Sequence, residues 1–96
     1  MQPLYVQIKC ELGRAYEVAD AIVDGLEETS EVYTTSGVWD LLAKFYLSEG
    51  DSPGKFVNDK LHRIPGIRDT HTILAFRLFG GSGGPPLVEG QASAGR

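Results

Sequence analysis

A short polar turn and two spaced threonines are the residues of this chain best suited to binding a small molecule. The turn lies between two strand-like runs, and the threonines open the last strand-like run. Together they are Ser36, Gly37, Val38, Trp39, Asp40, Thr70 and Thr72. A carboxylate at a glycine turn and hydroxyls on a strand can form a polar site if the fold brings them together.

Each of these residues also has a purely structural explanation. Asp40 can accept local backbone hydrogen bonds and so fix the turn, as aspartates in turns often do. Threonine is common in strands, which accounts for Thr70 and Thr72 without a ligand. Trp39 suits a core or an interface equally well, so the residues alone leave both interpretations open.

The sequence offers little for catalysis or for metal binding. The two histidines, His62 and His71, have no partner at metal-ligand spacing, and no Ser/His/Asp or Cys/His set can be assigned to one site. His62 lies near the end of a predicted helix, where it suits capping. The single cysteine, Cys10, cannot form an internal disulfide. We therefore expect no catalytic residue, no metal and no cofactor.

Charge and hydropathy limit the partners of the chain. The formal net charge is -4, and Lys and Arg form no run anywhere in the sequence. Because contacts from Lys and Arg to phosphates supply most non-specific affinity for nucleic acids, direct DNA binding is not expected. No segment resembles a secretion signal or is long and apolar enough to span a bilayer. We expect a cytoplasmic protein that does not bind membranes.

The first third of the sequence predicts a strand and a helix. Apolar and polar residues alternate from Leu4 to Leu12, which is typical of a half-buried strand whose buried face includes Leu12. After Gly13 the apolar residues recur every three or four positions. This period predicts an amphipathic helix from about Arg14 to Glu28, with Val23 in its apolar stripe.

The middle of the sequence predicts a hairpin, a second helix and a last strand. The hairpin comprises residues 31–36 and 39–48 and turns at Gly37, which permits a positive φ. Ser52 and Pro53 then suit the N-cap and first residue of a helix that ends before Pro65. Residues 67–79 predict a long final strand, apolar on most of both faces.

The predicted order of strand, helix, strand, strand, helix, strand is the ferredoxin-like βαββαβ arrangement of the α+β class. Right-handed crossovers place both helices on one face of an antiparallel sheet of four strands. The open face is expected to carry Tyr5, Gln7, Lys9, Tyr33, Thr35, Leu42, Lys44, Tyr46 and, from the last strand, either the series His71, Ile73 and Ala75 or its complement. Such a surface is too apolar to remain in water, so we expect dimerisation through the open sheet face.

The chain divides into a folded part and a tail. Residues 1–79 contain every predicted element and are expected to form the domain. Residues 80–96 are rich in Gly, Pro and Ser and bury too little apolar surface to offset the entropy of ordering. We expect residues 80–96 to be a flexible tail.

Two segments give the chain a resemblance to a known family. Residues 35–42 resemble a Gly-x-Tyr-Asp turn followed by apolar residues, with Trp39 where tyrosine is commoner. Residues 64–67, Ile-Pro-Gly-Ile, lead to Thr70 and Thr72 as the family pattern requires. On these residues, and over positions 4 to 79, the chain resembles the effector-binding domain of the Lrp/AsnC transcription regulators, also called the RAM or αβ-plait domain.

The resemblance implies a non-catalytic module that senses a small molecule, expected to be an amino acid, and that forms oligomers. Dimers of the family pack through their open sheet faces and associate into octameric or decameric rings. Full-length members carry an amino-terminal helix-turn-helix domain, whereas the first strand here begins at Leu4. The chain therefore resembles the stand-alone members that lack a DNA-binding domain, and co-assembly with full-length regulators is a possible mode of action.

The resemblance also implies a ligand site near the contact between dimers, against the glycine turn. Its ligand-binding residues would be Ser36, Gly37, Val38, Trp39, Asp40, Thr70 and Thr72. Asp40 would accept hydrogen bonds from the ammonium of an amino acid. Backbone N–H groups around Gly37 and the threonine hydroxyls would donate to its carboxylate, and Trp39 or a neighbouring subunit would supply an apolar wall.

Two other classes of function fit the same fold. Small dimeric α/β-barrel enzymes of the monooxygenase or isomerase type use the cavity between sheet and helices, and His71 would be the candidate general base there. A purely structural oligomerisation module with a degenerate pocket is the other alternative. Fold alone does not separate these classes.

Overall fold

The strand predicted from the alternating residues 4–12 is an inner strand of the sheet. The computed structural model describes residues 1–79. Its strands are β1 (Gln2–Cys10), β2 (Thr29–Thr34), β3 (Leu41–Leu47) and β4 (Ile67–Leu74). They form a four-stranded antiparallel sheet in the order β2-β3-β1-β4, so β1 has a hydrogen-bonded neighbour on each side. The predicted ferredoxin-like topology is confirmed.

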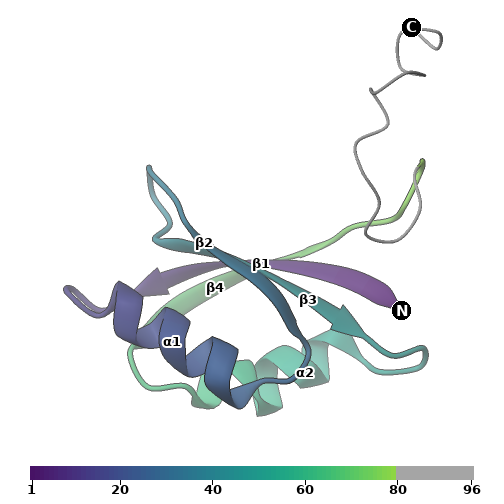
Figure 1. Cartoon of the computed structure of the whole chain (residues 1–96), viewed down its shortest axis with the longest axis horizontal. Helices are drawn as coiled ribbons and strands as arrows, with labels where there is room; N and C mark the ends of the chain where they lie inside the picture. Colours follow the sequence, from purple (N-terminus) through teal and green to yellow (C-terminus); the bar gives the residue numbers. More distant parts are fainter. Residues whose placement is uncertain (80–96) are drawn as a thin grey trace, which may run out of the picture.

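Both helices lie on one side of the sheet (Figure 1). They are α1 (Ala15–Gly25) and α2 (Pro53–Asp59), and a 3-10 turn, η1 (Leu61–Arg63), follows α2. The Ser52 side chain accepts a hydrogen bond from the N–H of Lys55 at 3.3 Å, which confirms the predicted N-cap ahead of Pro53. Within residues 1–79, no helix has the length and apolar character needed to cross a bilayer.

Helix α1 ends at Gly25 rather than at Glu28, because Leu26 already has an extended backbone. Glycine is a poor helix former, and here nothing lies within 4 Å of where a Cβ of Gly25 would be. Gly25 therefore marks the end of the helix and is not required for close packing.

The core lies between the helices and the covered face of the sheet. Alternate residues of β1 and β3 meet apolar side chains of α1, α2 and η1, and Phe45 packs edge-on against Phe56 with ring centroids 4.9 Å apart. The buried set is Leu4, Val6, Ile8, Cys10, Val18, Ile22, Leu26, Leu41, Ala43, Phe45, Leu47, Phe56, Val57 and Leu61. Each fully buried Leu, Val, Ile or Phe contributes roughly 1.5–3 kcal/mol relative to exposure.

Two residues predicted to be buried are exposed. Leu12 is 96% exposed, because β1 ends at Cys10 and the chain then turns at Gly13, where φ is +79°. Val23 is 59% exposed. It lies about 100° around α1 from the buried Ile22, beyond the stripe that faces the sheet.

The last strand is shorter than predicted. β4 ends at Leu74, which pairs with Leu4, and few residues of β1 remain beyond that pair to extend the ladder. Phe76, Leu78 and Phe79 follow outside the strand and are 77%, 82% and 73% exposed. The tail predicted for residues 80–96 lies outside the described residues.

The second face of the sheet is uncovered by any element within residues 1–79, as Figure 1 shows. The register confirms that this face carries Tyr5, Gln7, Leu42 and Lys44, and it shows which β4 residues join them: Tyr5 is opposite Lys44 and Ile73, and Gln7 is opposite Leu42 and His71. The ammonium of Lys44 lies 5.7 Å from the ring centroid of Tyr5 and 4.9 Å from that of Tyr46. These cation–π contacts hold the ammonium against the aromatic side chains of the open face.

Gly66 is a position at which a side chain would not fit. Its φ is +96°, and a Cβ there would lie 2.9 Å from Cγ2 of Val18. Its carbonyl accepts a hydrogen bond from the N–H of Glu11 at 2.8 Å, which ties the turn before β4 to the end of β1. The absence of a side chain at this position therefore allows β4, β1 and α1 to meet.

We expect Gly66→Ala to lower the free energy of unfolding by about 3 kcal/mol, because left-handed backbone strain adds to crowding against Val18. Gly13→Ala is the matched control, since its φ is also positive but nothing lies within 4 Å of its Cβ position. The control should lose only about 1–2 kcal/mol. Urea denaturation of both variants measures the difference, and equal losses would show that Val18 moves aside without penalty.

Candidate functional site

The Gly37 turn connects β2 to β3 and is held by backbone and side-chain hydrogen bonds. The Thr35 N–H donates to the carbonyl of Asp40 at 3.0 Å, and the Thr35 hydroxyl donates to the carbonyl of Trp39 at 2.8 Å. Gly37 has φ of +97°, the conformation predicted for it. From β1, Nζ of Lys9 donates to the carbonyl of Val38 at 2.7 Å. The turn is therefore anchored to the central strand.

Asp40 continues the pairing between β3 and β1 with its side chain. Its N–H donates to the carbonyl of Ile8 at 2.9 Å, and its Oδ2 accepts from the N–H of Cys10 at 2.7 Å. The ladder between β1 and β3 ends at the pair of Ile8 and Leu41, so a carboxylate oxygen takes the place of a strand acceptor for the Cys10 N–H. Asp40 thus has a structural role, although the second oxygen, Oδ1, bonds to no described residue.

Cys10 is a buried free thiol beside this carboxylate. Burial raises the pKa of the Cys10 thiol, and the negative charge of Asp40 raises that pKa further. The thiol therefore stays protonated at neutral pH and is a weak nucleophile. Among residues 1–79, His, Cys, Asp and Glu form no group of three or more able to hold a metal ion.

Asp40 lines a surface pocket of about 400 Å³ at the end of β1, which we call the Asp40 pocket. The lining comes from the end of β1, the following turn and start of α1, the Gly37 turn and the start of β4. Its residues are Lys9, Cys10, Glu11, Leu12, Gly13, Ala15, Tyr16, Asp40 and Arg68. The pocket therefore combines two cations, two carboxylates and an apolar wall of exposed side chains, among them Leu12 and Tyr16.

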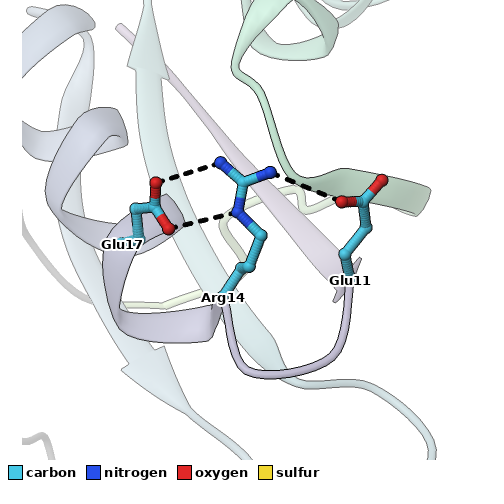
Figure 2. Close-up of polar contacts among 3 residues, drawn as sticks. All are labelled: Glu11, Arg14 and Glu17. Carbon is cyan, nitrogen blue, oxygen red and sulfur yellow. Dashed lines mark hydrogen bonds and ion pairs between the residues drawn. The ribbon is translucent and has the colours of Figure 1, made fainter.

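Arg14 holds the turn that forms one wall of the Asp40 pocket. Figure 2 shows its guanidinium between two carboxylates: Nε and Nη2 donate to Glu17 at 3.1 and 3.0 Å, and Nη1 donates to Glu11 at 3.4 Å. The hydrogen bonds from Arg14 lower the pKa of Glu17. Because Glu11 is engaged in this way, its charge is already partly balanced within the wall.

Trp39 lies on the open face of the sheet. Its ring centroid is 6.1 Å from that of His71, and His71 is opposite Gln7 on the uncovered side. The enzyme alternative placed His71 inside a cavity between the sheet and the helices. Because His71 lies on the uncovered face, that placement is wrong. The residues buried within 1–79 include no polar or charged side chain apart from the thiol of Cys10.

The two threonines lie on the other face from Trp39. Thr70 is opposite Ile8 and Thr72 is opposite Val6, both on the helix side of the edge strand β4. The Thr70 hydroxyl lies 2.8 Å from Nε2 of His62 in η1. His62 therefore bonds across to β4 from the last turn of η1.

Of the predicted ligand-binding residues, only Asp40 lines the Asp40 pocket within one chain. Ser36, Gly37 and Val38 are exposed on the turn, and Trp39 is on the open face. Thr70 lines a separate pocket of about 150 Å³, and Arg68 lines both this pocket and the Asp40 pocket. Sequence reasoning missed Lys9, Glu11, Tyr16 and Arg68 as pocket residues. The predicted strand topology could have identified Arg68, because antiparallel pairing of β4 with β1 places the start of β4 beside the end of β1.

We expect Asp40→Ala to lower the free energy of unfolding by about 1–3 kcal/mol, because the Cys10 N–H loses its acceptor. Asp40→Asn keeps an amide oxygen in the same place and should retain most of the stability. Ser36→Ala, an exposed change in the same turn, is the control and should have little effect. Chemical denaturation measures all three, and equal losses in the alanine and asparagine variants would contradict the acceptor role.

Comparison with known proteins identifies relatives over most of the chain. Residues 4–80 match the family model described as the Lrp/AsnC ligand binding domain. The chain is 33% identical over 73 residues to the HTH-type transcriptional regulator FL11 of Pyrococcus abyssi, a match that covers 76% of this chain and 47% of that protein. The chain thus spans about half the length of the curated relatives it matches.

Solved structures show the same fold. TTHA0845 from Thermus thermophilus superposes with a TM-score of 0.74 at 28% identity, over 84% of this chain and 100% of that chain. A transcriptional regulator from Neisseria meningitidis, solved as a complex with L-Met, superposes with a TM-score of 0.71 at 18% identity, over 90% of this chain and 56% of that one.

Proposed function

The chain belongs to the Lrp/AsnC ligand-binding domain family, and we propose that it is a non-catalytic regulatory module that senses an amino acid. The observation that carries the proposal is the Asp40 pocket, where carboxylates, cations and exposed apolar side chains line one surface hollow. A zwitterion with an apolar side chain requires these three kinds of group. The Neisseria regulator solved with L-Met supports an amino acid as the ligand class.

The module works as a homo-oligomer in this proposal. Its open sheet face carries Tyr5, Leu42, Tyr46 and Ile73 around Lys44, and no described element covers them. Packing against the same face of a second copy would remove this apolar surface from water in a two-fold arrangement. Association of such dimers into an octamer or a decamer would bring the Gly37 turns of neighbouring copies near one another.

Neighbouring copies also account for the predicted residues that lie outside the Asp40 pocket. We propose that Ser36, Gly37, Val38, Trp39, Thr70 and Thr72 contribute to ligand binding through contacts made in the oligomer. In a single chain Thr70 and Trp39 lie on opposite faces of the sheet, so one bound molecule would not reach both within one copy.

The route to gene regulation is through other proteins in this proposal. An acidic chain without a basic run is a poor direct ligand for DNA. Co-assembly with full-length Lrp/AsnC-type regulators would transmit the ligand signal. This role places the protein in the cytoplasm.

A charge at the centre of the open sheet face should disrupt the dimer. Leu42 lies on the inner strand β3 between Gln7 and Tyr33, so Leu42→Glu would bury an unpaired carboxylate in the interface. We expect wild type to be a dimer or larger by light scattering at micromolar concentration and Leu42→Glu to shift towards monomer. Val23→Glu, which places the same charge on the exposed side of α1, should leave the dimer intact. A monomeric wild type would contradict the proposal.

Asp40→Asn should separate folding from ligand binding. The amide retains the acceptor for the Cys10 N–H but loses the charge that attracts an ammonium. We expect affinity for the amino acid identified by a thermal-shift screen of the common amino acids to fall about 10- to 100-fold, the effect of a charged hydrogen bond of roughly 1.5–3 kcal/mol. Calorimetry measures the change, and unaltered affinity would exclude Asp40 from the site.

A further inference from the structure

Arg68 differs from the other charged residues of the Asp40 pocket because it has no ion pair or hydrogen bond with any residue of 1–79. Lys9 donates to the carbonyl of Val38 at 2.7 Å, and Glu11 is bonded by Arg14 at 3.4 Å. Asp69, next to Arg68 in sequence, has its Oδ1 2.8 Å from the N–H of Thr70 and forms no ion pair with Arg68. A guanidinium therefore lines the pocket with its donors available.

The carboxylate of Asp40 is only half engaged. Oδ2 accepts from the Cys10 N–H at 2.7 Å, and Oδ1 bonds to no described residue. The pocket thus offers one available cation and one available carboxylate oxygen, on different segments of its lining. This pair of complementary charges matches the two charges on the α-carbon of an amino acid.

We infer that Arg68 binds the α-carboxylate of the ligand, while Oδ1 of Asp40 accepts from its α-ammonium. The inference rests on the proposed function and assigns the carboxylate to Arg68 rather than to the backbone around Gly37 or to Thr70 and Thr72. Arg suits this role because its planar guanidinium can donate two parallel hydrogen bonds to one carboxylate.

The charged residues of the Asp40 pocket also indicate which ligand side chain the pocket accepts. Once Arg68 and Asp40 are used, the remaining charges, Lys9 and Glu11, are already engaged within the protein. The wall near them offers Leu12 and Tyr16, which are 96% and 81% exposed and gain burial against an apolar group. The pocket therefore favours neutral, apolar amino acids over acidic or basic ones.

The test compares free amino acids with their amides, which keep the ammonium but lack the carboxylate. Calorimetry on the full chain uses L-leucine, L-methionine and L-phenylalanine, each with its amide, together with L-glutamate and L-lysine. We expect wild type to bind the tightest apolar acid roughly tenfold or more tightly than its amide. Arg68→Gln should abolish this preference, because the acid loses much more affinity than its amide. Arg63→Gln is the control, because Arg63 lies outside the pocket and donates to the carbonyl of Asp59.

The outcomes distinguish the inference from the proposed function. If wild type binds an amino acid and Arg68→Gln retains the preference for the acid, the role of Arg68 is wrong while the proposed function stands. If L-glutamate or L-lysine binds more tightly than every apolar acid, the predicted selectivity for neutral, apolar amino acids is wrong. If wild type binds no amino acid at all, the proposed function fails and the inference fails with it.

Discussion

Strand β1 pairs with a neighbour on each edge and packs against the helices on one face. These contacts position the other strands and helices of residues 1–79. Leu4, Val6 and Ile8 are fully buried between the sheet and the helices. A shift of one residue in register would turn these apolar side chains towards solvent. Two short helices cover only one face of the sheet, and residues 1–79 supply nothing for the other face. Burial of the core and exposure of the open face are therefore consequences of the same topology.

The Asp40 pocket forms where the regular pairing of β1 ends. Beyond Ile8 the ladder to β3 has no further backbone acceptor in register, and the Asp40 carboxylate takes its place at the Cys10 N–H. On the other side the register with β4 shifts, and Gly66 brings the start of β4 close to α1. This local irregularity brings two groups to the Asp40 pocket: a carboxylate oxygen and an arginine, neither of which bonds to another residue of 1–79.

Adjacent residues at the end of the Gly37 turn lie on the open face of the sheet and in the lining of the Asp40 pocket. Trp39 packs near His71 on the uncovered side, and the next residue, Asp40, lines the pocket. A partner that covers the open face would restrain Trp39 and, through the continuous backbone, the position of the Asp40 carboxylate. In the proposed function, this geometry would provide a short physical connection between assembly and ligand binding.

The amino-acid sequence by itself determined the elements, their order and the two faces of the sheet. Alternation in β1 and β3, the Ser52-Pro53 cap and the glycine turn are local signals, and the short-range physics behind them acts within a few residues. Their limits appeared where periodicity continued past the end of an element, as at Leu12 and after Leu74, and where an apolar helix residue lay outside the buried stripe, as at Val23.

Only the tertiary structure decided which polar residues share a pocket. Trp39 and Thr70 belong to one sequence-based set but lie on opposite faces, whereas Arg68 and Asp40, far apart in sequence, line the same hollow. Their proximity depends on strand register and on the shift between Lys9 and Cys10. These features are fixed by the packing of the whole sheet rather than by any local pattern of residues.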